Sequence, residues 1–416
     1  MTTQNPSPAQ RLVFLDWVRI LAFGLLVFYH VGMYYVSWDW HVKSPHAGTW
    51  LEPWMRLSSP WRMDLLFMVS GAATAFMLAR SGASGELLAL RARRLLLPLL
   101  FGVLVVVPPQ SWLEVVHKLG YSGSYADFMR LYLGAYGGFC FRAGHCLVIP
   151  TWNHLWFLPY LFVYTLLLWA VLRRSPAWLD RIAARLPQAL AGPRLFLWPV
   201  ILLVLTRMLM VRRFPVTHAL VDDWFAHCQY FALFLLGAAL TRAPSVWVRM
   251  AACRWQALAL ALTGWALLVG EPPMFAGNEV LFALLRPVFY SLQQWCAIVA
   301  ALGFARAHMN RDNALRRYLT DAVFPLYILH QTAIIVLASV LAPWQLRPGV
   351  EGVLLVLATF ALCLAGYEGV RRLRWLRPLF GLRVGAALIA RHNAADATTG
   401  VDSGGGNRGT GRRSGV

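Results

Sequence analysis

The sequence predicts an all-α protein, a polytopic membrane helical bundle of about ten transmembrane helices. The first observation is composition, since 59% of the 416 residues are hydrophobic, only 13% are charged and the mean hydropathy is +0.55. The second is that the apolar residues gather in runs close to the length of about 20 residues that a helix needs to cross a bilayer. The third is that basic residues are enriched in alternate connections between these runs, which is typical of membrane topology. Together they exclude a soluble globular enzyme.

Ten apolar runs, taken in chain order, are the expected spans. The fifth and sixth are the weakest, because the fifth contains Arg207 and the sixth is short. The first is not expected to be a signal peptide, since Asp16 and Arg19 occupy positions that are apolar in such peptides. The spans are expected at 13–33, 60–79, 95–112, 152–172, 195–211, 228–241, 254–270, 286–306, 321–341 and 351–370.

The distribution of Lys and Arg predicts the orientation of the bundle. The positive-inside rule assigns the connections richer in these residues, and with them both termini, to the cytoplasm. The net charge of +20 is therefore interpreted as a topology signal with an added attraction to anionic lipid and to an anionic cytoplasmic substrate, and not as nucleic-acid binding. We expect a multi-pass protein of the plasma (inner) membrane.

The chain is expected to form one membrane domain. Residues 1–10 are a short polar lead, residues 11–391 form the membrane domain, and residues 392–416 have the Gly-, Ser-, Thr- and Arg-rich composition of a disordered cytoplasmic tail. The longest outer connections are expected at 34–59 and 113–151.

The first span carries a stripe of ionisable residues. Asp16, Arg19 and His30 fall within roughly 60° of one another on a helical wheel. Such groups are costly against lipid, so they are expected to face a polar interior. His30 lies near the outer end, where an imidazole suits proton transfer near neutral pH. A straight helix separates it from Arg19 by about 16 Å, so a partner that orients His30 must come from another element.

The fourth span opens with Asn153, His154 and Trp156, at the depth expected for His30. These residues either line a cavity or anchor the helix at the interface. The aromatic loop 34–59 allows the same two interpretations, with Trp40 and His41 as candidates for a sugar site.

Polar residues also occur within or at the start of other spans. His330 and Gln331 lie in the ninth, and are expected either to bond neighbouring helices or to contact substrate. Arg62 and Asp64 lead the second span, in which Gly71 indicates close helix approach.

Arg91, Arg93 and Arg94 precede the third span on the cytoplasmic side. Arginine suits bidentate contact with phosphate, although these residues also serve as topology determinants. The sequence contains no Gly-rich phosphate loop or Rossmann signature, so an anionic donor would be held by such Arg clusters.

Cysteine and histidine spacing indicates no permanent metal or cofactor. Cys140 and Cys146 share an outer loop and permit a disulfide if that side is oxidising. His145 between them permits a zinc site, but the spacing matches no familiar metal pattern.

These motifs together resemble the acyltransferase-3 superfamily of integral membrane acyltransferases. The resemblance covers residues 11 to 383 and rests on Arg19 followed after ten residues by His30, with five short segments: Phe-Leu-Asp at 14–16, Phe-Met-Val-Ser-Gly at 67–71, Arg-Arg-Leu-Leu-Leu-Pro at 93–98, His-Leu-Trp-Phe-Leu at 154–158 and Phe-Pro-Leu-Tyr-Ile-Leu-His at 324–330. Within that superfamily the chain is similar to osmoregulated periplasmic glucan succinyltransferases, in Trp-His-Val at 40–42 and Tyr-Glu-Gly-Val-Arg-Arg at 367–372.

The resemblance implies transfer of an acyl group, acetyl or succinyl, from a cytoplasmic acyl-CoA co-substrate to a hydroxyl of a periplasmic or envelope glycan. His30 would act as general base or as a transient acyl carrier, and both roles use a neutral imidazole. The alternative function is a transporter or flippase of an acylated glycan or lipid, in which the same residues would line a substrate or proton path.

Overall fold

The computed structural model describes residues 12–81, 84–142, 145–270 and 277–382. The described part is predominantly helical, with one two-stranded antiparallel sheet. The elements are α1 (Val13–Tyr35), α2 (Glu52–Ser58), α3 (Arg62–Ser81), α4 (Gly85–Phe101), the π-helix η1 (Gly102–Val106), α5 (Pro108–Leu119), α6 (Tyr125–Leu133), β1 (Cys140–Arg142), β2 (His145–Cys146), the 3-10 helix η2 (Asn153–Trp156), α7 (Phe157–Arg174), α8 (Trp178–Ala189), α9 (Arg194–Met210), α10 (Trp224–Leu240), α11 (Pro244–Ala252), α12 (Arg254–Val269), α13 (Glu279–His308), α14 (Ala314–Leu341), η4 (Ala342–Trp344), α15 (Pro348–Arg372) and η5 (Pro378–Phe380).

Each of the ten apolar runs predicted as a span has a helical counterpart. Among the described residues, six helices are long and apolar enough to cross a membrane, and the number rises to eight if each of two sharply bent pairs, α8 with α9 and α10 with α11, makes one span. The predicted third span is interrupted by the π-helix η1, and the predicted seventh is the 16-residue α12. The count of ten and the cytoplasmic termini stay predictions.

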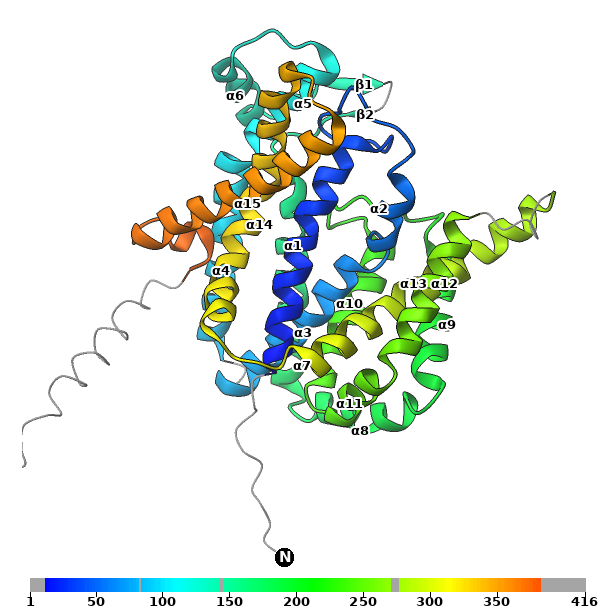
Figure 1. Cartoon of the computed structure of the whole chain (residues 1–416). Coiled ribbons are helices and arrows are strands. Elements are labelled where there is room, and N and C mark those ends of the chain that lie inside the picture. Colours follow the sequence, from blue (N-terminus) through cyan, green and yellow to red (C-terminus); the bar gives the residue numbers. More distant parts are fainter. Residues whose placement is uncertain (1–11, 82–83, 143–144, 271–276, 383–416) are drawn as a thin grey trace, which may run out of the picture.

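Helix α1 runs through the middle of the bundle and packs against α3, α13, α14 and α15 (Figure 1). α1 and α14 are joined by two polar pairs, Asp16 with Arg316 and His30 with His330, which share one sequence offset of 300. The two pairs are fourteen residues apart, or about 21 Å along a helix. The predicted polar stripe of α1 therefore faces α14.

Two glycines allow α3 and α10 to pack in direct backbone contact. A Cβ at Gly71 would lie 1.9 Å from the carbonyl oxygen of Phe234, and a Cβ at Gly237 would lie 1.9 Å from that of Met68. Small residues permit such close packing of membrane helices. The expectation of close helix approach at Gly71 is confirmed.

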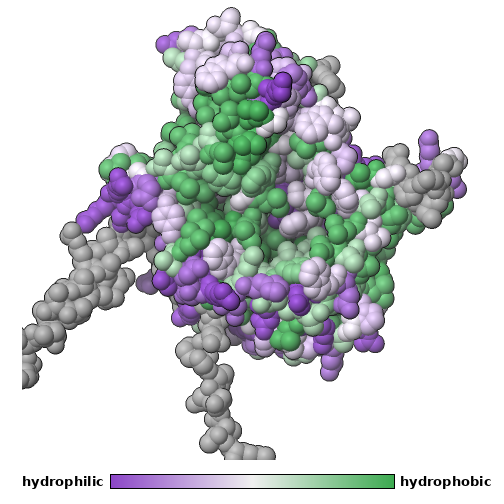
Figure 2. All heavy atoms as spheres, viewed as in Figure 1, coloured by the Kyte–Doolittle hydropathy of each residue, from purple (hydrophilic) through white to green (hydrophobic). Residues whose placement is uncertain are grey.

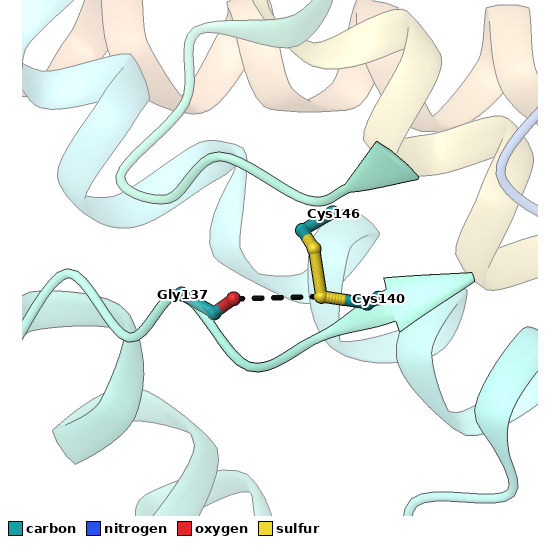
Figure 3. Close-up of a disulfide and its surroundings, with 3 residues drawn as sticks. All are labelled: Gly137, Cys140 and Cys146. Atoms are coloured by element: carbon teal, nitrogen blue, oxygen red, sulfur yellow. Dashed lines mark hydrogen bonds between the residues drawn. A yellow bond between two sulfur atoms is a disulfide. The ribbon is translucent and has the colours of Figure 1, made fainter. Parts of the chain in front are cut away.

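The two ends of the bundle carry different structures. α5, α6 and the β1–β2 hairpin gather at the upper end in Figure 1, and α8 and α11 lie at the lower end. A disulfide between Cys140 and Cys146 joins the two strands (Figure 3), which confirms the disulfide alternative. Figure 2 shows apolar side chains over the middle of the visible face and hydrophilic ones gathered along its lower edge, as a membrane protein requires.

Candidate active site

His30 is hydrogen-bonded to a second histidine from α14. Its Nδ1 lies 3.0 Å from Nε2 of His330, and Nδ1 of His330 lies 2.7 Å from the carbonyl oxygen of Tyr327. A carbonyl oxygen only accepts, so Nδ1 of neutral His330 carries the proton and its Nε2 accepts. Nδ1 of His30 therefore donates, and the lone pair of neutral His30 is on Nε2. The expected orienting partner from another helix is His330.

His30 lines a cavity of about 770 Å³ whose wall is rich in aromatic and polar side chains. His330 is only 2% exposed and does not line this cavity, so it contacts His30 from within the protein and not from the cavity. Among the predicted site residues, those that line the cavity with His30 are Trp40, His41, Arg62, Asp64, Asn153, His154, Trp156 and Gln331. The structure thus brings together residues from α1, the 34–59 loop, α3, η2 and α14.

His154 is held by three polar contacts. Its Nε2 donates to the carbonyl oxygen of Ile328 at 3.0 Å, its Nδ1 lies 3.4 Å from the amide nitrogen of Gln110, and its own carbonyl accepts from the Tyr327 hydroxyl at 2.6 Å. The ring meets that of His330 edge-on, with centroids 5.1 Å apart. His154 therefore buttresses the histidine pair from the α7 side.

Gln110 links two residues of the cavity wall, Asn153 and Gln331, to each other. Its side-chain oxygen accepts from Asn153 at 3.1 Å and from Gln331 at 3.0 Å, and its nitrogen donates to Thr332 at 2.6 Å. Asn153 has a φ of 40°, a left-handed backbone that Asn tolerates better than most residues. Gln110 follows the π-helix η1, where such irregularities often mark functional sites.

His41 continues this network from α14 to α5. Gln331 donates to its Nε2 at 3.0 Å, and its Nδ1 lies 2.5 Å from Oε2 of Glu114, whose Oε1 accepts from Lys118 at 2.9 Å. Burial alone would raise the pKa of Glu114, but His41 and Lys118 outweigh burial and lower that pKa to about 2. The carboxylate consequently stays ionised and fixes the His41 ring.

The 34–59 loop folds back over the end of α1. Lys43 Nζ donates to the carbonyl oxygens of Met33 and Val36, each at 2.7 Å, and so caps orphan carbonyls at the helix C-terminus. This fold places the Trp40 ring nearly parallel to that of His30, at 6.5 Å between centroids. Trp156 lines the same cavity and stacks on His218 at 4.0 Å.

A second polar cluster lies in the cavity wall between α3, α9, α10 and α13. Asp64 accepts hydrogen bonds from the amides of Gln229 at 3.0 Å and Gln294 at 2.7 Å. The oxygens of the same two amides face Arg207, at 3.5 and 3.3 Å. The two glutamines therefore hold Asp64 and Arg207 in a fixed arrangement.

The remaining predicted residues lie toward the other end of α1. Asp16 pairs with Arg316, which is 3% exposed, and lies 3.5 Å from Arg19. Arg19 and Arg94 are within electrostatic range of Arg91, and both Arg93 and Arg94 are exposed. None of these residues is part of the cavity wall around His30. The contact of Asp16 with Arg316 links α1 to α14.

Sequence reasoning did not select several residues that build the site. Gln110 is uncharged, and Glu114 lies just beyond the end of the predicted third span. Hydropathy alone therefore did not select either residue. Arg207 stood out only as a weakness of the fifth span, and Gln229 and Gln294 had no distinguishing pattern. An amide within an apolar run was the available signal, because such a group must find a partner away from lipid.

The fold and the site define a helical membrane protein with a cavity of mixed polar and aromatic lining, in which His30 lines the wall and is hydrogen-bonded to the buried His330. Residues 12–368 match the family described as an acyltransferase domain, and the chain therefore belongs to this acyltransferase-3 family. This confirms the resemblance inferred from the motifs.

Curated relatives include the glucans biosynthesis protein C of Escherichia coli O6:K15:H31 (strain 536 / UPEC), of strain SMS-3-5 / SECEC and of strain K12. Each is 29% identical over 163 residues, which are 39% of this chain and 39% of the relative's own length. No solved structure matches the chain.

Proposed function

We propose that the protein transfers an acyl group, acetyl or succinyl, from a cytoplasmic acyl-CoA to a hydroxyl of a periplasmic or envelope glucan. The observation that carries the proposal is the tautomer of His30, whose Nε2 is left as a proton acceptor by the hydrogen bond from Nδ1 to His330. A neutral imidazole with an oriented lone pair is suited to general-base or nucleophilic catalysis.

In the direct route, Nε2 of His30 removes the proton of the glucan hydroxyl as its oxygen attacks the thioester carbonyl carbon. The new C–O bond forms, the C–S bond breaks, and the CoA thiolate takes the proton from His30. In the alternative route, Nε2 itself attacks the thioester carbonyl carbon, so that an N–C bond forms and the C–S bond breaks with release of the CoA thiolate. The glucan hydroxyl oxygen then attacks the same carbon, the new C–O bond forms, the C–N bond to His30 breaks, and the hydroxyl proton goes to the CoA thiolate. Both routes need the tautomer that His330 imposes.

The positions of the other groups support a donor and an acceptor that approach from opposite ends. Arg19, Arg91 and Arg94 gather near the end of α1 remote from His30, where they suit the phosphates of a CoA donor. Trp40, Trp152 and Trp156 line the cavity that contains His30, and flat aromatic rings suit a sugar acceptor. The disulfide of the outer hairpin fits an oxidising outer compartment.

The test is turnover by the detergent-purified protein. Given acyl-CoA and a neutral glucan oligosaccharide, the protein should release free CoA thiol in step with acylated oligosaccharide, measured by a thiol reagent and by mass spectrometry. The variant His30→Ala should lose both products while it retains the thermal stability of the parent. The control is His46→Ala, an exposed histidine of the 34–59 loop, which should keep full activity.

A transporter or flippase would give a different outcome. It would move substrate across a vesicle membrane without breaking the thioester, and no CoA thiol would appear with any acyl donor. That result would contradict the proposed acyl transfer.

A further inference from the structure

The cavity that contains His30 also exposes two arginines from different helices. Arg62, at the start of α3, stacks its guanidinium carbon 3.2 Å above the ring of Tyr29. Its Nε and Nη1 are buried and have no hydrogen-bond partner among the described residues. Arg207, near the end of α9, stacks 3.8 Å above Tyr290, and its Nε is likewise buried and unpartnered within the described chain.

The charges of this part of the cavity do not balance. Asp64 is within electrostatic range of both arginines, and it accepts hydrogen bonds from the amides of Gln229 and Gln294. In the described part of the chain, no ion pair joins Asp64 to Arg62 or to Arg207 within 4.0 Å. Two guanidinium groups thus face one carboxylate, and buried charge without a partner is strongly unfavourable inside a membrane protein.

An anion entering from the cavity would resolve this imbalance. Arginine forms a planar pair of N–H donors that match a carboxylate bidentately. The cation–π contacts with Tyr29 and Tyr290 hold both guanidinium groups without using their in-plane donors. The arrangement is that of a preorganised carboxylate subsite.

The distance from this subsite to His30 limits the ligand. The centroids of Tyr29 and His30 are 5.7 Å apart, and Arg62 Cζ is 3.2 Å from the Tyr29 centroid, so Cζ lies at most 8.9 Å from the His30 ring centre. Three C–C bonds separate the two carbonyl carbons of a four-carbon diacid, which span about 4 Å. With a contact at each end, a chain of this length reaches beyond that limit, so one acyl group in a bent conformation can contact both the imidazole and the guanidinium.

We propose that Arg62 and Arg207 bind the free carboxylate of the transferred acyl group, and so select a dicarboxylic acyl donor over a neutral one. This inference rests on the proposed acyl transfer, and it makes the two arginines specificity-determining residues for that reaction. Asp64 acts through the two glutamines as a positioning residue for Arg207.

The test compares two acyl donors of equal carbon number, succinyl-CoA and butyryl-CoA, with the same neutral glucan acceptor. The parent protein should prefer succinyl-CoA in kcat/KM. Each of Arg62→Met and Arg207→Met should lower kcat/KM for succinyl-CoA by about 10- to 150-fold, the worth of a charge-assisted hydrogen bond, and leave butyryl-CoA within about threefold. The variant Arg207→Lys keeps the positive charge but loses the planar pair of donors. Its kcat/KM for succinyl-CoA should lie between that of the parent and that of Arg207→Met.

Arg212→Met is the matched control, because Arg212 is exposed just beyond α9 and does not line the cavity. Equal use of both donors by the parent, or equal loss of both in the Met variants at unchanged thermal stability, would overturn the carboxylate subsite. Charge selectivity that appears only with acidic acceptors would also overturn it, because the anion would then come from the acceptor. Absence of turnover with every donor would instead contradict the proposed function.

Discussion

Replacement of His330 tests whether the histidine pair sets the tautomer of the catalytic imidazole. His330→Phe keeps a flat ring of similar size in a site that is 2% exposed, but it removes the acceptor 3.0 Å from Nδ1 of His30. The Nδ1–H of His30 is then left without its partner, and the imidazole is free to place its proton on Nε2, where the proton blocks base catalysis.

The magnitude follows from that single hydrogen bond. An unsatisfied buried donor costs about 1–3 kcal/mol, so kcat should fall by about 5- to 150-fold if the bond is retained in the transition state. The KM for the acyl donor should not change, because His330 does not line the cavity. His330→Gln supplies a carbonyl oxygen as acceptor and should recover part of the lost kcat.

The assay is steady-state release of CoA thiol at saturating glucan, with thermal stability in detergent measured in parallel. His308→Phe is the control, because His308 is exposed at the end of α13. A kcat within twofold of the parent for His330→Phe would refute the tautomer argument. A loss shared equally by His330→Phe and His330→Gln would assign His330 to packing instead.

Three further predictions concern stability. Gly71→Ala should lower the melting temperature, since its Cβ would lie 1.9 Å from a carbonyl oxygen, whereas Gly24→Ala, with no atom within 4 Å, should not; equal melting temperatures would contradict the α3–α10 contact. The single variant Asp16→Leu should be less stable than the double variant Asp16→Leu with Arg316→Leu, because the single change leaves the buried Arg316 guanidinium without its Asp16 partner. Additive effects of the two substitutions on thermal unfolding would argue against this pair. The pKa of Glu114 is lowered from 4.5 to about 2, so its stabilising contribution is present above pH 4.5 and is lost as pH falls toward 2. Glu114→Gln should therefore flatten the dependence of the melting temperature on pH in this range. An unchanged dependence would contradict this role.

The features of this protein that the sequence predicted are those that depend on residues close together in the chain. Hydropathy located every helical counterpart of the ten predicted spans, and the charge stripe on α1 correctly predicted a polar partner surface for that helix. Both features are local, because a bilayer penalises each polar group wherever it lies along a helix. The bounds of α12, Arg254–Val269, follow the predicted run at 254–270, whereas the π-helix at 102–106 interrupts the predicted third span and has no counterpart in the hydropathy pattern.

The sequence by itself determined that this is a helical membrane protein, that α1 presents Asp16, Arg19 and His30 to its interior, and that its motifs belong to an acyltransferase family. Only the tertiary structure decided that His330 is the partner of His30, that Gln110 joins Asn153 to Gln331, and that Arg207 lines the same cavity as Arg62. The physical reason is register. The cost of burying a polar group requires that it find a partner, but which partner it meets depends on how helices distant in sequence slide and rotate against one another.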